Sequence, residues 1–341
     1  MKFSRKIIYI SFVLSIFVIS IHTYNLDTYK LIGQQDVLSK IVVFFETYMD
    51  RLEKVCVPFF FTISGYLFFR TFNWNKMVQK YQSRIKSLLI PYIIWCTLYF
   101  LMYAFITHIP VISRYMNMAP VSLTLTYYLQ CVWNNTYTTL WFVKDLIIQI
   151  IFAPLLYLIF PMRNKKIHWI IISIGSFLVL MLCGLGWIPL HIPYLNVFFL
   201  LGSYAGINMK HVVEEPDKKL ILPGLAGVII CLAIAMIGTL AENDGWRLLF
   251  IISLWFCLEW FSYKKEPQWW MGISFFIYCA HSIILESFEK LWLKAAGISV
   301  FAALMDYLFM PLIVLTIIIV IAYLLKRYLS NVWNVLTGNR V

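Results

Sequence analysis

The chain has 341 residues, of which 62% are hydrophobic and only 13% charged, and its formal net charge is +12. Soluble domains carry about 25% charged and about 45–50% apolar residues, so this composition excludes a soluble globular protein and indicates a membrane protein. The basic residues stand in short clusters between apolar runs, which argues against a nucleic-acid-binding surface. Seven scattered cysteines without a CxxC pair predict neither a disulfide framework nor a metal site.

The apolar runs predict an all-α, polytopic integral membrane protein with about ten transmembrane helices, because a span needs roughly 20 mostly apolar residues. In chain order the expected spans are 7–24, 55–71, 87–107, 140–160, 168–186, 194–209, 220–240, 247–262, 271–288 and 303–325. The stretch 119–133 is expected to form an interfacial helix, and the longest outer segments are expected at 25–54 and 108–139. We expect one transmembrane domain over 1–341, with no appended soluble domain.

The first apolar run, which follows Lys2, Arg5 and Lys6, resembles a secretory signal. The sequence His22-Thr23-Tyr24-Asn25 follows it in place of a cleavage site with small residues. We therefore expect this run to be retained as the first membrane helix.

Lysine and arginine set the predicted orientation of the spans. With ten spans, 19 of the 28 basic residues fall on the side of the N-terminus, eight fall on the other side, and Lys144 lies within a span. Because positively charged segments stay in the cytoplasm, both termini are predicted to be cytoplasmic.

Two histidines are expected at membrane depth. His22 ends the first span, and His281 lies in the ninth span three residues after Tyr278. An ionisable group in a membrane helix is costly unless it faces protein or water. His22 is either an interfacial anchor or a general base, since imidazole titrates near neutral pH. His281 is either a buried, hydrogen-bonded histidine or part of a substrate site.

The second span contains the stretch VPFFFTISGYLFFR, in which small and hydroxylated residues interrupt a run of phenylalanines. Small residues in a membrane helix let another backbone or a ligand approach closely. The residues alone leave two interpretations open. One is a helix-packing notch at Gly65, and the other is a ligand channel wall to which Ser64 offers a hydroxyl.

A basic cluster precedes the third span. Lys76, Lys80, Arg84 and Lys86 occur there without an acidic residue, and Lys80 and Arg84 are four positions apart, so they share a helix face. The positive-inside rule accounts for many such clusters. The alternative is a phosphate-binding site on the cytoplasmic face.

The fourth span opens with charged residues. Trp141 suits the outer interface. Lys144 and Asp145 follow, and as neighbours in a helix they do not face each other, so each needs its own partner. A charged pair so close to a span indicates a functional site.

Five segments together resemble the membrane-bound acyltransferase family 3, a group of bacterial O-acyltransferases. The segments, in chain order, are SFVLSIFVISIHTYN, VPFFFTISGYLFF, RIKSLLIPYIIW, LWFVKDLI and FFIYCAHSIIL. Small single-domain members that act on cell-surface glycans, such as the enterobacterial-common-antigen O-acetyltransferase, are similar in size and layout.

This resemblance implies an enzyme in the bacterial inner membrane that moves an acyl group, most often acetyl, from cytoplasmic acetyl-CoA to a hydroxyl of an extracytoplasmic glycan or glycolipid. No metal is expected, and the expected partners are membrane lipid, the glycan acceptor and acyl-CoA. By resemblance, His22 matches the family's essential histidine and Arg84 its basic residue at the head of the third span. The signature of the second span matches Ser64, Gly65 and Tyr66.

One position departs from the family pattern. The family usually has Arg or Lys eleven residues before its histidine, where this chain has Ser11. Lys6 or Arg84 is expected to take that role, with Lys80 and Lys86 as further phosphate contacts. The mechanism remains open between His22 as a general base and His22 as an acyl carrier.

Further residues are candidates for the acceptor site. Asp27 and Glu46 are expected to orient the imidazole of His22 or to bind the acceptor. The other candidates named for substrate binding are Trp141, Lys144, Asp145, Tyr278 and His281.

Two other functions compete with the acyltransferase. A transporter or flippase for lipid-linked sugar intermediates would need charged residues along a path between both faces, and the charges within the spans are few. A sensor or assembly partner without catalysis would tolerate replacement of His22.

Overall fold

The computed structural model describes residues 2–116, 119–160, 196–238, 241, 243–261 and 264–339. The regular secondary structure of these residues is entirely helical, which confirms the all-α class. Six helical stretches in this described part are long and apolar enough to cross a membrane: Lys2–His22, Val37–Phe69, Trp74–His108, Lys218–Ile237, Trp269–Ala296 and Val300–Tyr328. The chain is therefore a multi-pass membrane protein, while the count of ten spans and the cytoplasmic side of the termini stay predictions.

The helices of the N-terminal half are α1 (Lys2–His22), α2 (Val37–Glu53), α3 (Cys56–Phe69), α4 (Met77–Arg84), a π-helical turn (Ile85–Leu89), α5 (Ile90–His108), α6 (Pro110–Met116), α7 (Leu125–Asn134), α8 (Trp141–Ile151) and α9 (Ala153–Ile159). The helices of the C-terminal half are α11 (Val197–Asn208), α12 (Lys210–Glu214), α13 (Ile221–Ile237), α14 (Asp244–Cys257), α15 (Ser274–Ala296), α16 (Val300–Tyr328) and α17 (Ser330–Thr337).

The remaining four expected spans differ in outcome. The span 140–160 is divided at Phe152 into α8 and α9, and Pro154, which lacks a backbone N–H, stands in the first turn of α9. The spans 194–209 and 247–262 correspond to the shorter helices α11 and α14, with 12 and 14 residues. The span expected at 168–186 lies outside the described residues.

Helix α2 corrects one boundary. It occupies residues that the sequence analysis assigned to the outer segment 25–54, and it continues into α3 as one stretch of 33 residues. Asp36 caps α2, because its carboxylate accepts a hydrogen bond of 2.9 Å from the backbone N–H of Ser39. No continuous apolar run marks α2 in the sequence, because Glu46, Asp50 and Glu53 interrupt it, although all three carboxylates are buried on one face.

The expected interfacial stretch 119–133 contains a short helix. The side chain of Thr124 caps this helix, α7, and Leu125, Leu129 and Trp133 are exposed along it. Exposed apolar side chains are compatible with a helix at the membrane surface, and this location stays a prediction.

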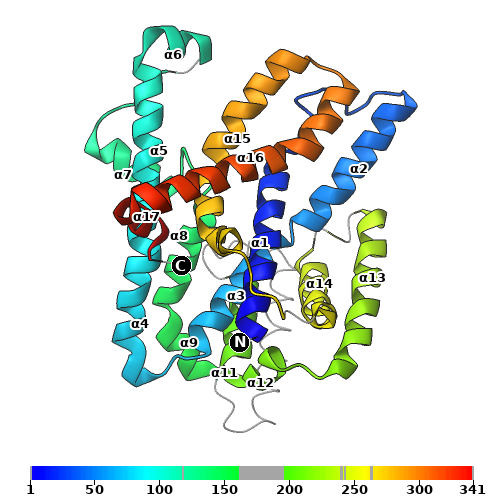
Figure 1. Ribbon diagram of the computed structural model, residues 1–341, viewed down its shortest axis with the longest axis vertical. Coiled ribbons are helices and arrows are strands. Elements are labelled where there is room, and N and C mark those ends of the chain that lie inside the picture. The colour runs from blue at the N-terminus through cyan, green and yellow to red at the C-terminus, as the bar shows by residue number, and fades with distance from the viewer. Residues whose placement is uncertain are drawn as a thin grey trace, which may run out of the picture.

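Helix α1 runs through the middle of the molecule, between α5 at one edge and α13 at the other (Figure 1). It packs against α2, α3, α15 and α16. Helix α16 is long and crosses the molecule towards α5, where α17 follows it (Figure 1). The indole N–H of Trp95 on α5 donates to the carbonyl of Leu336 at 3.0 Å, which fixes α17 on α5. Residues from opposite ends of the chain thus surround the first helix.

Candidate active site

The two histidines of the sequence analysis meet in the structure. His22 is the last residue of α1 and keeps exposed surface, whereas His281 lies in α15 and is fully buried. Their ring centroids are 5.1 Å apart and the ring planes are inclined by 34°. This distance places two imidazoles side by side at the packed contact between α1 and α15.

One hydrogen bond fixes the tautomer of neutral His281. Its Nδ1 lies 2.7 Å from the carbonyl oxygen of Tyr278, and because a carbonyl only accepts, Nδ1 carries the hydrogen. The lone pair is then on Nε2, which is buried and has no hydrogen-bond partner among the described residues. His281 therefore presents an unused acceptor in the neighbourhood of His22.

A carboxylate accompanies the histidine pair. Glu286 on α15 acts electrostatically on His22. The hydroxyl of Tyr103 donates to the Glu286 carboxylate at 2.9 Å and so joins α5 to the site. Glu286 is not among the site residues predicted from the sequence, since nothing in the local pattern links it to the end of α1.

The expected partners of His22 lie in different surroundings. Asp27 is exposed in the turn after α1, where its backbone carbonyl accepts from the Lys30 N–H at 3.1 Å. Glu46 is fully buried on α2, and α2 packs against α1. Only Glu46 of these two is therefore enclosed by protein.

The stretch around Gly65 packs tightly against α11. A Cβ atom at Gly65 would overlap the carbonyl oxygen of Phe199 and would lie 2.9 Å from the backbone nitrogen of Ser203. A Cβ at Gly202 would likewise overlap the backbone of Thr62. Of the two interpretations left open for Gly65, this contact agrees with the helix-packing notch.

The neighbours of Gly65 face other groups. Ser64 is half-buried. The hydroxyl of Tyr66 donates to the Glu214 carboxylate at 2.9 Å, and Arg70 forms an ion pair of 3.0 Å with the same oxygen. Glu214 thereby fastens the end of α12 to the end of α3.

The basic cluster gathers at the end of α3. The ammonium of Lys80 donates to the carbonyl of Phe68 at 3.1 Å and to the hydroxyl of Thr71 at 2.6 Å. Lys80 and Arg84 stand over the Phe68 ring, 5.4 and 5.6 Å from its centroid. The structure thus confirms that both residues share a face, while Lys86 is exposed in the π-helical turn.

Arg84 and Lys80 keep capacity to bind an anion. Neither residue forms an ion pair with an acidic side chain in the part of the chain that is described. The buried Nε of Arg84 also has no hydrogen-bond partner within that part. Guanidinium and ammonium groups without a carboxylate partner suit phosphate.

The environment of Lys6 differs from the one expected for a residue that binds acyl-CoA. Its ammonium is buried, forms an ion pair of 3.0 Å with Glu259 and donates to the carbonyl of Trp255 at 2.7 Å. It also lies 3.9 Å from the centroid of the Trp255 ring. Lys6 therefore fixes the start of α1 against the end of α14.

Two of the substrate-binding candidates, Lys144 and Tyr278, form hydrogen bonds with α7 and with the segment between α7 and α8. Lys144 donates to the carbonyl of Trp133 at 2.9 Å, and the hydroxyl of Tyr278 donates to the carbonyl of Thr139 at 2.6 Å. Asp145 is half-buried, and Trp141 is 46% exposed. Lys144 and Asp145 form no ion pair with each other among the described residues.

Comparisons with known proteins place these features in a family. The family model of acyltransferase family 3, described as "Acyltransferase domain", matches residues 6–327. The chain is similar to the "Succinoglycan biosynthesis protein ExoH" of Rhizobium meliloti (strain 1021), with 23% identity over 337 residues that cover 93% of this chain and 87% of that protein. No solved structure matches the chain.

Proposed function

This chain belongs to acyltransferase family 3, and on that basis we propose that it moves an acetyl group from cytoplasmic acetyl-CoA to a hydroxyl of a cell-surface glycan or glycolipid. The chain is a membrane-bound O-acyltransferase. Under this proposal it lies in the bacterial inner membrane and the acceptor reaches it from the extracytoplasmic side. The relative named for succinoglycan biosynthesis supports a polysaccharide as the acceptor.

The observation that carries this proposal is the position of His22. An exposed imidazole at the end of a membrane helix, beside a second buried imidazole, suits proton transfer near neutral pH. His22 takes the proton of the acceptor hydroxyl while the hydroxyl oxygen attacks the thioester carbonyl carbon. The new C–O bond forms as the C–S bond breaks, and the proton passes from His22 to the departing thiolate of CoA.

The competing mechanism uses His22 as the nucleophile. In that route an imidazole nitrogen attacks the thioester carbonyl carbon, and the C–S bond breaks to release the CoA thiolate. The acceptor hydroxyl oxygen then attacks the acyl carbon, the C–N bond to His22 breaks, and the hydroxyl proton is taken up by the released thiolate. Both routes need His22, but only the second produces a labelled protein when no acceptor is present.

The donor site in this proposal lies at α4 and the end of α3. Arg84, Lys80 and the exposed Lys86 hold the phosphates of CoA, because they are cationic and free of acidic partners in the described residues. Ser64 and Tyr66 line the path of the pantetheine arm. We leave Gly65 and Lys6 out of the donor site, because α11 covers Gly65 and Glu259 engages Lys6.

The test is acetyl transfer by the purified protein in lipid nanodiscs with radiolabelled acetyl-CoA, comparing wild type with His22→Ala. Loss of a general base is expected to lower turnover by about 100-fold or more. His108→Ala is the matched control, since His108 also ends a membrane helix and is exposed. Equal turnover by wild type and His22→Ala, with correct folding of both, would contradict the proposal.

A further inference from the structure

A buried polar group includes one residue of the segment that follows His22 in the chain. It consists of Asn25, Glu46 and Asp306, which come from three separate segments and are 5%, 0% and 4% exposed. Glu46 faces the backbone of Asn25 and is close enough to Asp306 for their charges to interact. Glu46 belongs to α2 and Asp306 to α16, which pack against each other, and Asn25 lies in the segment between α1 and α2. We call them the acceptor group.

The internal hydrogen bonds of this group leave several oxygens unused. The side-chain amide of Asn25 and the hydroxyl of Tyr29 both donate to Oδ2 of Asp306, at 3.3 and 3.2 Å. Burial and the Asp306 carboxylate raise the pKa of Tyr29, so this phenol stays a neutral donor. Oδ1 of Asp306, Oδ1 of Asn25 and the carboxyl oxygens of Glu46 have no side-chain partner among the residues that the structure describes.

Unpaired buried oxygens of this kind are costly, and most buried polar atoms in proteins have partners. The nearby carboxylate of Glu53 provides a comparison for Glu46. Glu53 lies two turns from Glu46 on the same face of α2 and accepts a hydrogen bond of 3.2 Å from Tyr307. Glu53 is therefore bonded to a side chain of the protein, whereas Glu46 has only the backbone of Asn25 beside it.

The unused atoms determine the chemistry of a ligand. The Asn25 amide oxygen and the Asp306 carboxylate accept hydrogen bonds, so they suit a ligand that donates them, and the carboxylate repels an anionic ligand. The Glu46 carboxyl offers a further hydrogen bond in either protonation state. Sugar hydroxyls meet this requirement. Phosphates, including those of CoA, do not.

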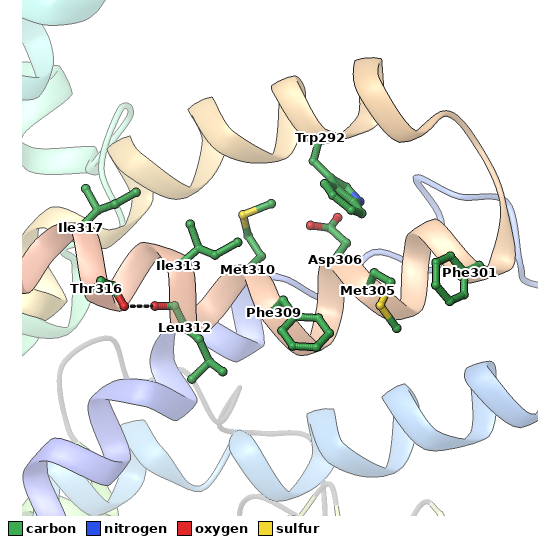
Figure 2. A pocket seen from close by; sticks show the side chains of 10 residues that line it. All are labelled: Trp292, Phe301, Met305, Asp306, Phe309, Met310, Leu312, Ile313, Thr316 and Ile317. Carbon is green, nitrogen blue, oxygen red and sulfur yellow. Dashed lines mark hydrogen bonds between the residues drawn. The ribbon is translucent and has the colours of Figure 1, made fainter.

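An apolar groove adjoins the acceptor group. It has a volume of about 700 Å³ and is lined by α16 and by Trp292 of α15. Figure 2 shows the Asp306 carboxylate between the two helices beside Trp292, while Phe309, Met310 and Ile313 continue the apolar lining. A hydrogen-bond acceptor at the wall of an apolar groove suits a ligand with hydroxyls at one end and hydrocarbon at the other.

We propose that the acceptor group binds the sugar hydroxyls of a glycolipid whose hydrocarbon chain lies in the α15–α16 groove. Asn25 is three residues from His22 in the chain, and in this proposal a neighbouring hydroxyl of the same sugar reaches the imidazole. This inference rests on the proposed function and selects the glycolipid as the acceptor. Asn25, Glu46 and Asp306 are positioning residues in this site.

A labelling experiment tests this site without acetyl-CoA. The protein in nanodiscs is treated with dicyclohexylcarbodiimide, which modifies carboxyl groups in membranes, and the modification of Glu46 is followed by peptide mass spectrometry. Octyl β-D-glucoside is the probe. At twice its Kd it is expected to slow modification of Glu46 by about threefold, since the free fraction falls as 1/(1 + [L]/Kd). Modification of Glu53, the internal control, is expected to remain unchanged.

Three further probes decide the chemistry. Octyl tetraethylene glycol ether has the same chain but no sugar, methyl β-D-glucoside has the sugar but no chain, and sodium chloride supplies a cation. The proposal requires that none of them protects Glu46 as octyl glucoside does. Equal protection by any of them, or no protection by octyl glucoside, overturns it.

An activity measurement separates this inference from the proposed function. Glu46→Gln is expected to lower acetyl transfer to octyl glucoside by about tenfold while acetyl-CoA binding is unchanged, because only the glycolipid loses its contact with the carboxyl. Glu53→Gln, which keeps an acceptor for Tyr307, is expected to retain transfer. Equal loss in both variants overturns the subsite. If wild type transfers no acetyl group at all, the proposed function fails, and the labelling pattern still decides whether the subsite exists.

Discussion

The imidazoles of His22 and His281 lie with their centroids 5.1 Å apart, although one residue ends the first membrane helix and the other lies in α15. His281 is completely enclosed, and the carbonyl of Tyr278 occupies its Nδ1. Its Nε2 is consequently an acceptor held in a fixed orientation next to an accessible imidazole. From this arrangement we propose a positioning role for His281 towards His22 or towards the acceptor hydroxyl.

Replacing His281 with Asn is expected to lower kcat for acetyl transfer by about tenfold, since one oriented hydrogen bond is lost. The KM for acetyl-CoA is expected to stay unchanged, because the basic cluster is on other helices. Steady-state kinetics of the nanodisc protein measure both constants. The control is Ser282→Ala on the same helix, where the hydroxyl lies 2.7 Å from that of Tyr99. A parallel change in KM and kcat for both variants would argue for a general packing defect instead.

Arg84→Gln is expected to raise the KM for acetyl-CoA by about tenfold, because a charge-assisted contact with phosphate is lost. If Arg84 contacts the 3′-phosphate, wild type prefers acetyl-CoA to acetyl-dephospho-CoA, which lacks that phosphate. The Arg84→Gln variant is then expected to use the two donors equally well. Competition kinetics with both donors give this ratio. Lys218→Gln removes an exposed cation elsewhere and serves as the control. An unchanged donor preference in Arg84→Gln would assign the contact to another phosphate.

Gly65→Val is expected to destabilise the protein by about 1–3 kcal/mol or more, because the added side chain overlaps the backbone of α11. Tryptophan fluorescence during heating measures the change as a lower Tm. Ala226→Val adds the same kind of bulk on an exposed position of α13 and is expected to leave the Tm nearly unchanged. A stable Gly65→Val protein that binds acetyl-CoA poorly would favour the channel-wall interpretation of this residue.

Glu259→Gln is expected to cost about 3–5 kcal/mol of stability, since it leaves the buried ammonium of Lys6 without its charged partner. Thermal unfolding of the purified variant provides the measurement. Glu266→Gln breaks the ion pair with Arg5, but the Glu266 side chain is 72% exposed, so a loss of only about 0–1 kcal/mol is expected. Similar melting temperatures for the two variants would show that the Lys6 pair is not structurally important.

The sequence alone determined the features that depend on local composition. The apolar runs identified the membrane class, the helical architecture and the approximate place of the long helices. Spacing four residues apart predicted that Lys80 and Arg84 share a face, and the structure confirms it. Helix α2 was missed for the same local reason, since Glu46 and Glu53 break its apolar run.

The tertiary structure decided which distant residues meet. Local patterns carry no information on the contact of His22 with His281, because helix packing alone brings α1 and α15 together. Packing also filled the space beside Gly65 with α11 and paired Lys6 with Glu259. Glu46 became a buried carboxylate only because α2 turns its polar face onto α1 and α16. Each of these outcomes depends on the partner that a side chain faces, and a helix's own sequence does not specify that partner.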